Sequence, residues 1–187
     1  LAVRHAASRL RGEVNLFHYR LSDYVYLAPT GQLVDGLIEA RYRQGSARYQ
    51  GAEARLDAGL HGNLWLNLGL DWVRAELADS EMPLPRIPPL RGRIGLDARL
   101  GGFSLRPGVV MAGRQDRLFP TETPTAGYSV FNLDASYTVA SRRAVHIFGV
   151  NAFNLGDRLY RNHLSFIKEY APEIGRGVRF SYTIQVF

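Results

Sequence analysis

Hydrophobic and polar residues alternate along several stretches of this chain. In the segment 179–186, RFSYTIQV, every second residue is apolar, and the segments 131–139 and 64–72 repeat the pattern. Successive side chains of a β-strand point to opposite faces of the sheet. The alternation therefore predicts strands with one apolar and one polar face.

The same pattern, interrupted by clusters of turn residues, predicts about nine strands. They are expected near residues 1–5, 10–26, 39–60, 64–78, 90–100, 103–117, 128–139, 143–155 and 177–187.

The connections between these strands are of two kinds, and the two kinds alternate. Tight connections are expected at 6–8, 61–63, 101–102 and 140–143. Longer ones, rich in Pro, Thr, Gly and charged residues, are expected at 27–36, 78–89, 119–127 and 156–176. This asymmetry is typical of an up-and-down barrel in an outer membrane, with short periplasmic turns and long outer loops.

The polar face separates two β architectures. The exposed face of a soluble sandwich favours Lys, Glu and Thr, but this chain contains a single lysine, Lys168. Arg, Asp, Glu and Asn alternate with the apolar residues instead, as in Glu53, Arg55 and Asp57. Arginine pairs with carboxylates through two parallel hydrogen bonds, which suits charges crowded in a lumen. A transmembrane β-barrel is therefore favoured over a soluble sandwich.

Aromatic residues near strand ends support a membrane position, because such residues form girdles at the two interfaces. The residues expected in these girdles are Tyr24, Tyr26, Trp65, Trp72, Phe103, Tyr128 and Tyr137.

Composition excludes several other classes. The chain has no Cys, which removes disulfides, thiolate metal sites and cysteine nucleophiles. A net charge of +6 would suit nucleic acid, but the 23 Lys and Arg residues are dispersed, so no nucleic-acid partner is expected. No apolar run approaches the roughly 18 residues of a membrane helix.

Most candidate ligand-binding residues lie in the longest connection. His163 lies near Glu169 and Glu173, and a histidine with carboxylates is able to ligate zinc or receive a metal chelate. The spacing fits no compact metal motif, and a solvated cap is the alternative interpretation. Further upstream, Asp116 and Arg117 form either an anion-attracting cluster or an ordinary salt bridge.

No catalytic residues are expected. No serine occupies a G-x-S-x-G turn, and no pair of hydrolase carboxylates is identifiable. An outer-membrane barrel enzyme and a soluble carbohydrate-binding β-protein remain alternative functions.

The C-terminal stretch 150–187 resembles the end of TonB-dependent outer-membrane receptors. In that family an Asn-Leu-x-Asp turn leads into a loop, a Gly-Arg pair and a closing strand that ends on an aromatic residue. The matching residues are Asn154, Leu155, Asp157, Tyr160, Gly175, Arg176 and Phe187. The segments 17–27, 49–56 and 83–89 resemble other pieces of the same barrel. The loop 161–176 is most similar to the branch associated with zinc and other metal uptake.

The resemblance implies an outer-membrane location in a Gram-negative bacterium and a barrel of about 22 strands around a plug. Residues 1–187 are then expected to be a C-terminal fragment of the barrel domain, without the plug. The implied function is energy-coupled uptake of a scarce nutrient, such as a metal ion, an iron–siderophore complex, zinc or cobalamin. No cofactor is implied. The implied partners are membrane lipid, the remaining strands and plug, the TonB complex, the barrel-assembly machinery and a small metal-containing ligand.

The resemblance also implies roles for particular residues. The loop 157–176 corresponds to the last extracellular loop. His163, Glu169 and Glu173 would meet a metal ion or labile metal complex, whereas Tyr160, Phe166 and Tyr170 would contact a preformed organic chelate.

Two positions depart from the family pattern. Gly156 stands where members typically carry Phe. Phe187, the aromatic residue implied as the assembly signal, directly follows Val186 and so falls out of phase with the apolar face. This phase slip indicates either a bulge in the last strand or an unusual signal.

Overall fold

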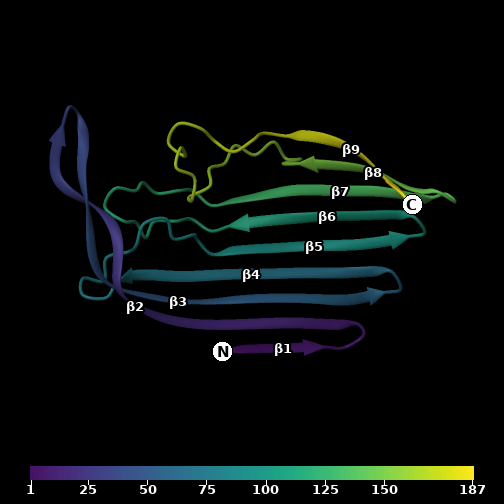
Figure 1. The fold of residues 1–187 in the computed structure, drawn as a ribbon, viewed down its shortest axis with the longest axis horizontal. Coiled ribbons are helices and arrows are strands. Elements are labelled where there is room, and N and C mark those ends of the chain that lie inside the picture. The colour runs from purple at the N-terminus through teal and green to yellow at the C-terminus, as the bar shows by residue number, and fades with distance from the viewer.

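The computed structural model describes residues 1–187 as one antiparallel sheet of nine strands whose order follows the chain (Figure 1). The strands are β1 (Ala2–Ala6), β2 (Leu10–Val34), β3 (Leu37–His61), β4 (Leu64–Leu77), β5 (Arg91–Leu100), β6 (Phe103–Ala112), β7 (Tyr128–Ala140), β8 (Ala144–Phe153) and β9 (Gly177–Val186). The structure contains no helix with the length and hydropathy needed to cross a membrane.

The alternation of connections is confirmed except between β2 and β3, which a two-residue turn joins. Figure 1 shows the two ends of the sheet. The connections after β1, β3, β5 and β7 are tight and lie at one end of the sheet, called here the short-turn end. The others lie at the opposite, long-loop end. The loops 78–90, 113–127 and 154–176 are named here loop A, loop B and loop C.

The prediction of a loop at 27–36 is wrong. Strands β2 and β3 continue through this region as a hairpin that closes at Asp35 and Gly36, which both have positive φ. Leu33 pairs with Ile38 and Val34 with Leu37, so apolar cross-strand pairs reach the tip. The Pro and Gly that suggested a loop fall in a shift of register between Pro29 and Leu33. The strand predicted at 103–117 is also too long, since β6 ends at Ala112 and the rest belongs to loop B.

The register places the apolar residues of neighbouring strands on one face. Leu56 of β3 lies opposite Leu68 of β4, which lies opposite Ile94 of β5. In the second half, Tyr137, Phe148 and Tyr182 form a similar row. Only 18 of the 187 residues are buried, so this apolar face has no cover within the chain. It requires an apolar surrounding, either lipid or more protein.

A bulge in β2 changes which face some aromatic residues occupy. The register shifts by one residue between Leu21 and Tyr24, and Asp23 within the shift has a φ of 57°. After it, Tyr24 lies opposite Gly45, on the polar face of the sheet. Tyr24 and Tyr26 therefore do not join the outer girdle expected from the sequence. They pack beside a small buried cluster of Ala47, Ala75, Leu77 and Leu84.

Candidate ligand-binding surface

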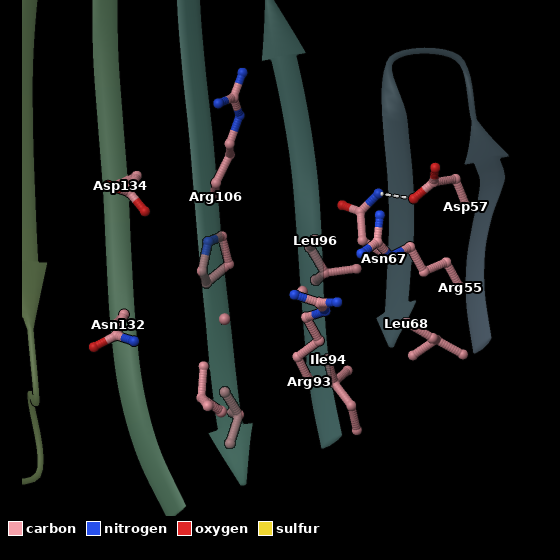
Figure 2. Close-up of a pocket in the computed structure, with 15 residues that line it drawn as sticks. Arg55, Asp57, Asn67, Leu68, Arg93, Ile94, Leu96, Arg106, Asn132 and Asp134 are labelled. Carbon is pink, nitrogen blue, oxygen red and sulfur yellow. Dashed lines mark hydrogen bonds between the residues drawn. The ribbon is translucent and has the colours of Figure 1, made fainter. Parts of the chain in front are cut away.

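The polar face carries a trough across β3 to β7. Figure 2 shows Arg55, Arg93 and Arg106 above these strands, together with Asn67 bonded to Asp57. The trough encloses about 490 Å³. Its lining includes Gly95 of β5 and Gly108 of β6, which lie directly opposite each other and have no side chain to fill the space.

Charged and amide groups in the trough and beside it on the polar face are paired with one another. Asn67 donates to Asp57 at 2.6 Å, and Arg99 donates to Asp97 at 2.7 Å. The Arg106 Nε lies 3.5 Å from the second of these carboxylates. The wall is therefore a set of neighbouring donors and acceptors from different strands, with the side-chain orientation that the alternation predicts.

Loops A and B are joined at the long-loop end by one carboxylate. Glu122 of loop B accepts the backbone N–H of Arg86 in loop A at 2.7 Å, and its other oxygen accepts the N–H of Phe119 at 3.1 Å. The Phe119 ring is buried and meets the edge of Tyr26. Gln115 adds a further bond between the two loops, from its Nε2 to the Ile87 carbonyl at 2.7 Å.

His163 connects loop C to loops A and B. Its side chain is buried, with Nδ1 lying 2.9 Å from the Thr125 Oγ1 and 3.3 Å from the Lys168 Nζ. Its Nε2 faces the Glu122 Oε1 at 3.7 Å. His163 was predicted on a surface loop, whereas in the structure its ring is buried. The reason is the polar partners that loop B supplies, which are 38 and more residues away in the chain.

Lys168, the only lysine, is buried beside His163. Its Nζ donates to the Thr123 carbonyl at 2.6 Å and to the Thr125 Oγ1 at 3.0 Å. Because the Thr125 oxygen accepts from the ammonium, its own hydroxyl proton is free to be donated to Nδ1 of His163. In that tautomer the imidazole proton is on Nε2, which lies 3.7 Å from the Glu122 Oε1 and makes no hydrogen bond.

Burial lowers the pKa of His163 below its ordinary value, and the positive charge of Lys168 acts in the same direction. Glu122 opposes these two effects. The neutral form of His163 thus belongs to the closed arrangement of the three loops.

The two glutamates predicted beside His163 lie elsewhere. Glu169 accepts a hydrogen bond from Thr123 and lies 3.7 Å from the Lys168 Nζ, with about half of its side chain exposed. Glu173 lines a different cavity. No group of three His, Asp or Glu residues has the arrangement of a metal site. The metal-binding role of His163 stays a prediction, now for a histidine whose ring faces other side chains.

The aromatic residues of loop C also divide into two groups. Tyr160 packs on Tyr128 of β7, with ring centroids 4.4 Å apart. Both tyrosines and Glu173 line a cavity of about 360 Å³ on the polar face, with Asn132 and Asn151 on its floor. Phe166 and Tyr170 are instead 83% and 90% exposed. Their ligand-binding roles stay predictions.

Asn154 closes the base of loop C, a function that the sequence analysis does not assign to it. It is buried, has a φ of 48°, and its Nδ2 donates to the carbonyls of Arg158 and Ile174 at 2.9 and 3.2 Å. Its Oδ1 accepts the Arg158 N–H at 2.8 Å. Asp157 supports the same closure by accepting the Arg176 N–H at 2.9 Å. The Asn-Leu-x-Asp motif was the sequence feature that could have indicated this role.

Phe187 lies just beyond β9 and donates its N–H to the Arg143 carbonyl at 3.2 Å. The pairing of β9 with β8 is continuous from Gly177 to Val186, so β9 contains no bulge. Of the two explanations for the phase slip, the bulge is therefore excluded. The role of Phe187 as an assembly signal stays a prediction.

The sequence of this chain matches a known protein family. The sequence model described as TonB dependent receptor-like, beta-barrel, matches residues 1–155. The chain belongs to this family. The predicted all-β, antiparallel barrel architecture is thereby confirmed.

Solved structures of TonB-dependent receptor barrels show the same fold. The copper transporter OprC aligns over 100% of this chain and 31% of its own, with 21% identity and a TM-score of 0.84. The ferric citrate transporter FecA, unliganded, aligns over 100% and 30%, with 17% identity and a TM-score of 0.78. The FrpB iron transporter from Neisseria meningitidis aligns over 100% and 30%, with 14% identity and a TM-score of 0.72.

The chain thus spans about a third of the length of these receptors. No curated protein sequence matches it significantly. The nine strands are part of the wall of a TonB-dependent receptor barrel: the apolar face is its exterior, and the polar face is its lumen.

Proposed function

We propose that this chain forms part of the barrel wall and the extracellular loops of an outer-membrane receptor for energy-coupled uptake of a metal-containing nutrient. The main support for this proposal is the cavity at the long-loop end of the lumenal face. Tyr128, Tyr160, Glu173, Asn132 and Asn151 line it. It lies where a ligand arriving from outside would first reach the polar trough.

The names of the structural neighbours support a metal-containing cargo. They include a copper transporter, a ferric citrate transporter and a ferric preacinetobactin receptor. The remaining partners proposed for this chain follow from the family: a plug, the TonB complex, the barrel-assembly machinery and outer-membrane lipid.

Between a bare metal ion and a preformed chelate, the side chains favour the chelate. The Nδ1 of His163 is occupied by Thr125 and Lys168, and its Nε2, which has no hydrogen-bond partner, faces a single carboxylate, Glu122, at 3.7 Å. Tyr160 and Tyr128 offer a paired aromatic surface with a carboxylate and amides around it. Aromatic side chains supply a large contact area at little entropic cost. Uptake of zinc or another labile ion, as in the zinc-associated branch, is the alternative.

Two triple variants of the full receptor separate the two ligand classes. Tyr160→Ala, Phe166→Ala and Tyr170→Ala together should impair growth on a limiting iron chelate at least tenfold in the concentration required. His163→Ala, Glu169→Ala and Glu173→Ala should impair growth on limiting zinc or copper only if the ion itself is the cargo. Leu159→Ala, another exposed position in loop C, is the matched control.

Normal growth of both triple variants under every limitation, at wild-type surface levels, would reject a ligand-binding role for loop C. Loss of growth on zinc alone would reject the chelate and favour the metal ion.

A further inference from the structure

On the exterior face of β2, β3 and β4, apolar residues give way to charged and polar ones near the long-loop end. Leu16, Ala52 and Trp72 lie opposite one another as the last apolar row across β2, β3 and β4. The next row on the same face is His18, Gln50 and Arg74, and the one above it is Arg20, Arg48 and Glu76. Together with Arg117 of loop B, which bonds to Glu76, these two rows are named here the basic belt.

The belt carries more positive than negative charge. Its four arginines face two carboxylates, Glu76 and the exposed Glu81, whose Oε1 lies 3.9 Å from the Arg48 Nη2. Arg20 is exposed, takes part in no ion pair and lies directly opposite Arg48. Like charges in opposite positions of a sheet repel each other. Arg20 has no counter-ion, and Arg48 shares Glu76 with two other arginines.

The guanidinium groups of the belt also retain free hydrogen-bond donors. Glu76 is almost completely buried by Arg48, Arg74 and Arg117, which all bind its two oxygens. Arg74 uses only its Nε, at 3.1 Å, and its side chain is 44% exposed. Glu76 thus fixes three guanidinium groups in place while leaving several of their N–H groups unpaired.

The position of the belt identifies its partner. Arg74 follows Trp72 by two residues, about 7 Å along the strand, so the belt lies just outside the apolar band. That is the level of lipid headgroups in the outer leaflet, because aromatic residues mark the edge of the hydrocarbon. The belt faces away from the lumen, which separates it from the proposed ligand cavity.

We propose that the basic belt binds the phosphate groups of an anionic lipid in the outer leaflet. A phosphate accepts the paired N–H groups of arginine and supplies the counter-ion that Arg20 lacks. The acyl chains of the same lipid would lie on the apolar rows below, along Leu16 and Leu70. This inference rests on the outer-membrane placement in the proposed function.

Lipid binding to the purified full receptor in neutral detergent tests the proposal. The probes are diphosphorylated lipid A and the same lipid after enzymatic dephosphorylation, detected by native mass spectrometry. The variant Arg20→Gln with Arg74→Gln removes two charges and leaves Arg48 and Arg117 on Glu76. It should weaken binding of the diphosphorylated lipid about tenfold or more, because each basic residue near an anionic lipid surface contributes about fivefold.

Arg142→Gln with Arg143→Gln is the matched control, since it removes the same charge at the short-turn end. It should leave binding unchanged. Glu81→Gln adds to the net positive charge of the belt without touching the buried carboxylate, and should strengthen binding about twofold.

Equal binding of both lipids, or wild-type binding by the Arg20 and Arg74 variant, would overturn the proposal. Displacement of the lipid by millimolar inorganic phosphate would show a site for free phosphate and overturn it as well. If the receptor fails to migrate as a heat-modifiable barrel, the proposed function fails too, whereas an inserted barrel without phosphate preference overturns only this inference. The Glu81 variant still decides the question if the double variant does not fold.

Discussion

The barrel wall and the loop assembly at its outer end are stabilised in different ways. In the wall, backbone ladders join neighbouring strands, and a side chain such as Leu68 contributes through the face it occupies. In the loops, few residues form regular structure, and single side chains such as Glu122, His163 and Asn154 hold distant backbone segments. The wall is therefore tolerant of changes that keep the alternation, whereas the loops depend on individual polar residues.

The largest expected effect is a charge on the exterior of the wall. Leu68→Arg should destabilise the inserted barrel by about 2 to 4 kcal/mol, because that position lies in the apolar band. Asn67→Arg, one residue away on the lumenal face, should cost much less by this route. Unfolding in urea, followed by heat-modifiable migration on gels, measures both. Equal losses on the two faces would contradict the assignment of exterior and lumen.

A somewhat smaller and more local effect is expected at the base of loop C. Asn154→Ala removes three hydrogen bonds to the backbone of Arg158 and Ile174 and puts a residue that tolerates the left-handed conformation less well than asparagine at a φ of 48°. Each of these hydrogen bonds contributes about 0.5 to 1.5 kcal/mol, so loop C should open while the barrel remains folded. Limited proteolysis within 156–176 reads this directly. Asn132→Ala is a milder comparison, since its side chain accepts only the Asn154 N–H.

The junction of the three loops should respond to pH. The pKa of His163 is lowered in the folded state, so the folded protein binds its proton less readily than the open loop does. Stability of the closed loops is therefore complete above the ordinary value of 6.5 and falls as the pH drops below it. The loss is at most about 1.4 kcal/mol per pH unit.

Hydrogen exchange of loop C at pH 7.5 and pH 5.5, corrected for intrinsic rates, would show this opening. In His163→Gln the extra opening at low pH should disappear. Persistence of the same pH dependence in that variant would assign it to another group.

The smallest effect on stability is expected at the C-terminus. Removing Phe187 deletes one backbone hydrogen bond, to Arg143, which contributes about 0.5 to 1.5 kcal/mol. If Phe187 is also the assembly signal, the amount of inserted receptor should fall far more than this stability loss explains. Removing Val186 as well takes away its pairing with Ala144 and should lower insertion further. Unchanged outer-membrane levels after both deletions would place the signal elsewhere.

The strands of the wall were predictable because their information is local. The period-two pattern at 64–72 and 179–186 fixes both the strand and the face of each residue, and the pairing of β4 and β9 agrees with it. The hairpin at 27–36 was not predictable by the same rule, because Pro29 and Gly31 obscure a ladder that resumes at Leu33. The bulge before Tyr24 was missed for a related reason: a single inserted residue leaves no period of its own but reverses the face of all that follows.

In the candidate site, by contrast, most of the arrangement depends on tertiary contacts and little of it on local sequence. Loop C was recognised by its length and composition, and Tyr160 and Glu173 do line a cavity on the lumenal face. The surroundings of His163 were out of reach, because Glu122 and Thr125 lie on another loop about 40 residues away. Their proximity depends on which strands are neighbours and on how loops A and B fold together. The closeness of Glu169 and Glu173 to His163 in the sequence was no guide to closeness in space.

The sequence by itself determined that this chain is an antiparallel sheet with an apolar and a polar face, because alternation acts residue by residue. It also determined the contrast between tight turns and long loops everywhere except at 27–36, because that contrast follows from local turn chemistry. Only the tertiary structure decided that His163 and Lys168 are buried, that Asn154 closes loop C, and that Arg20, Arg48 and Arg74 form one belt. Each of these depends on register and on contacts between segments far apart in the chain, and such contacts leave no periodic signal in the sequence.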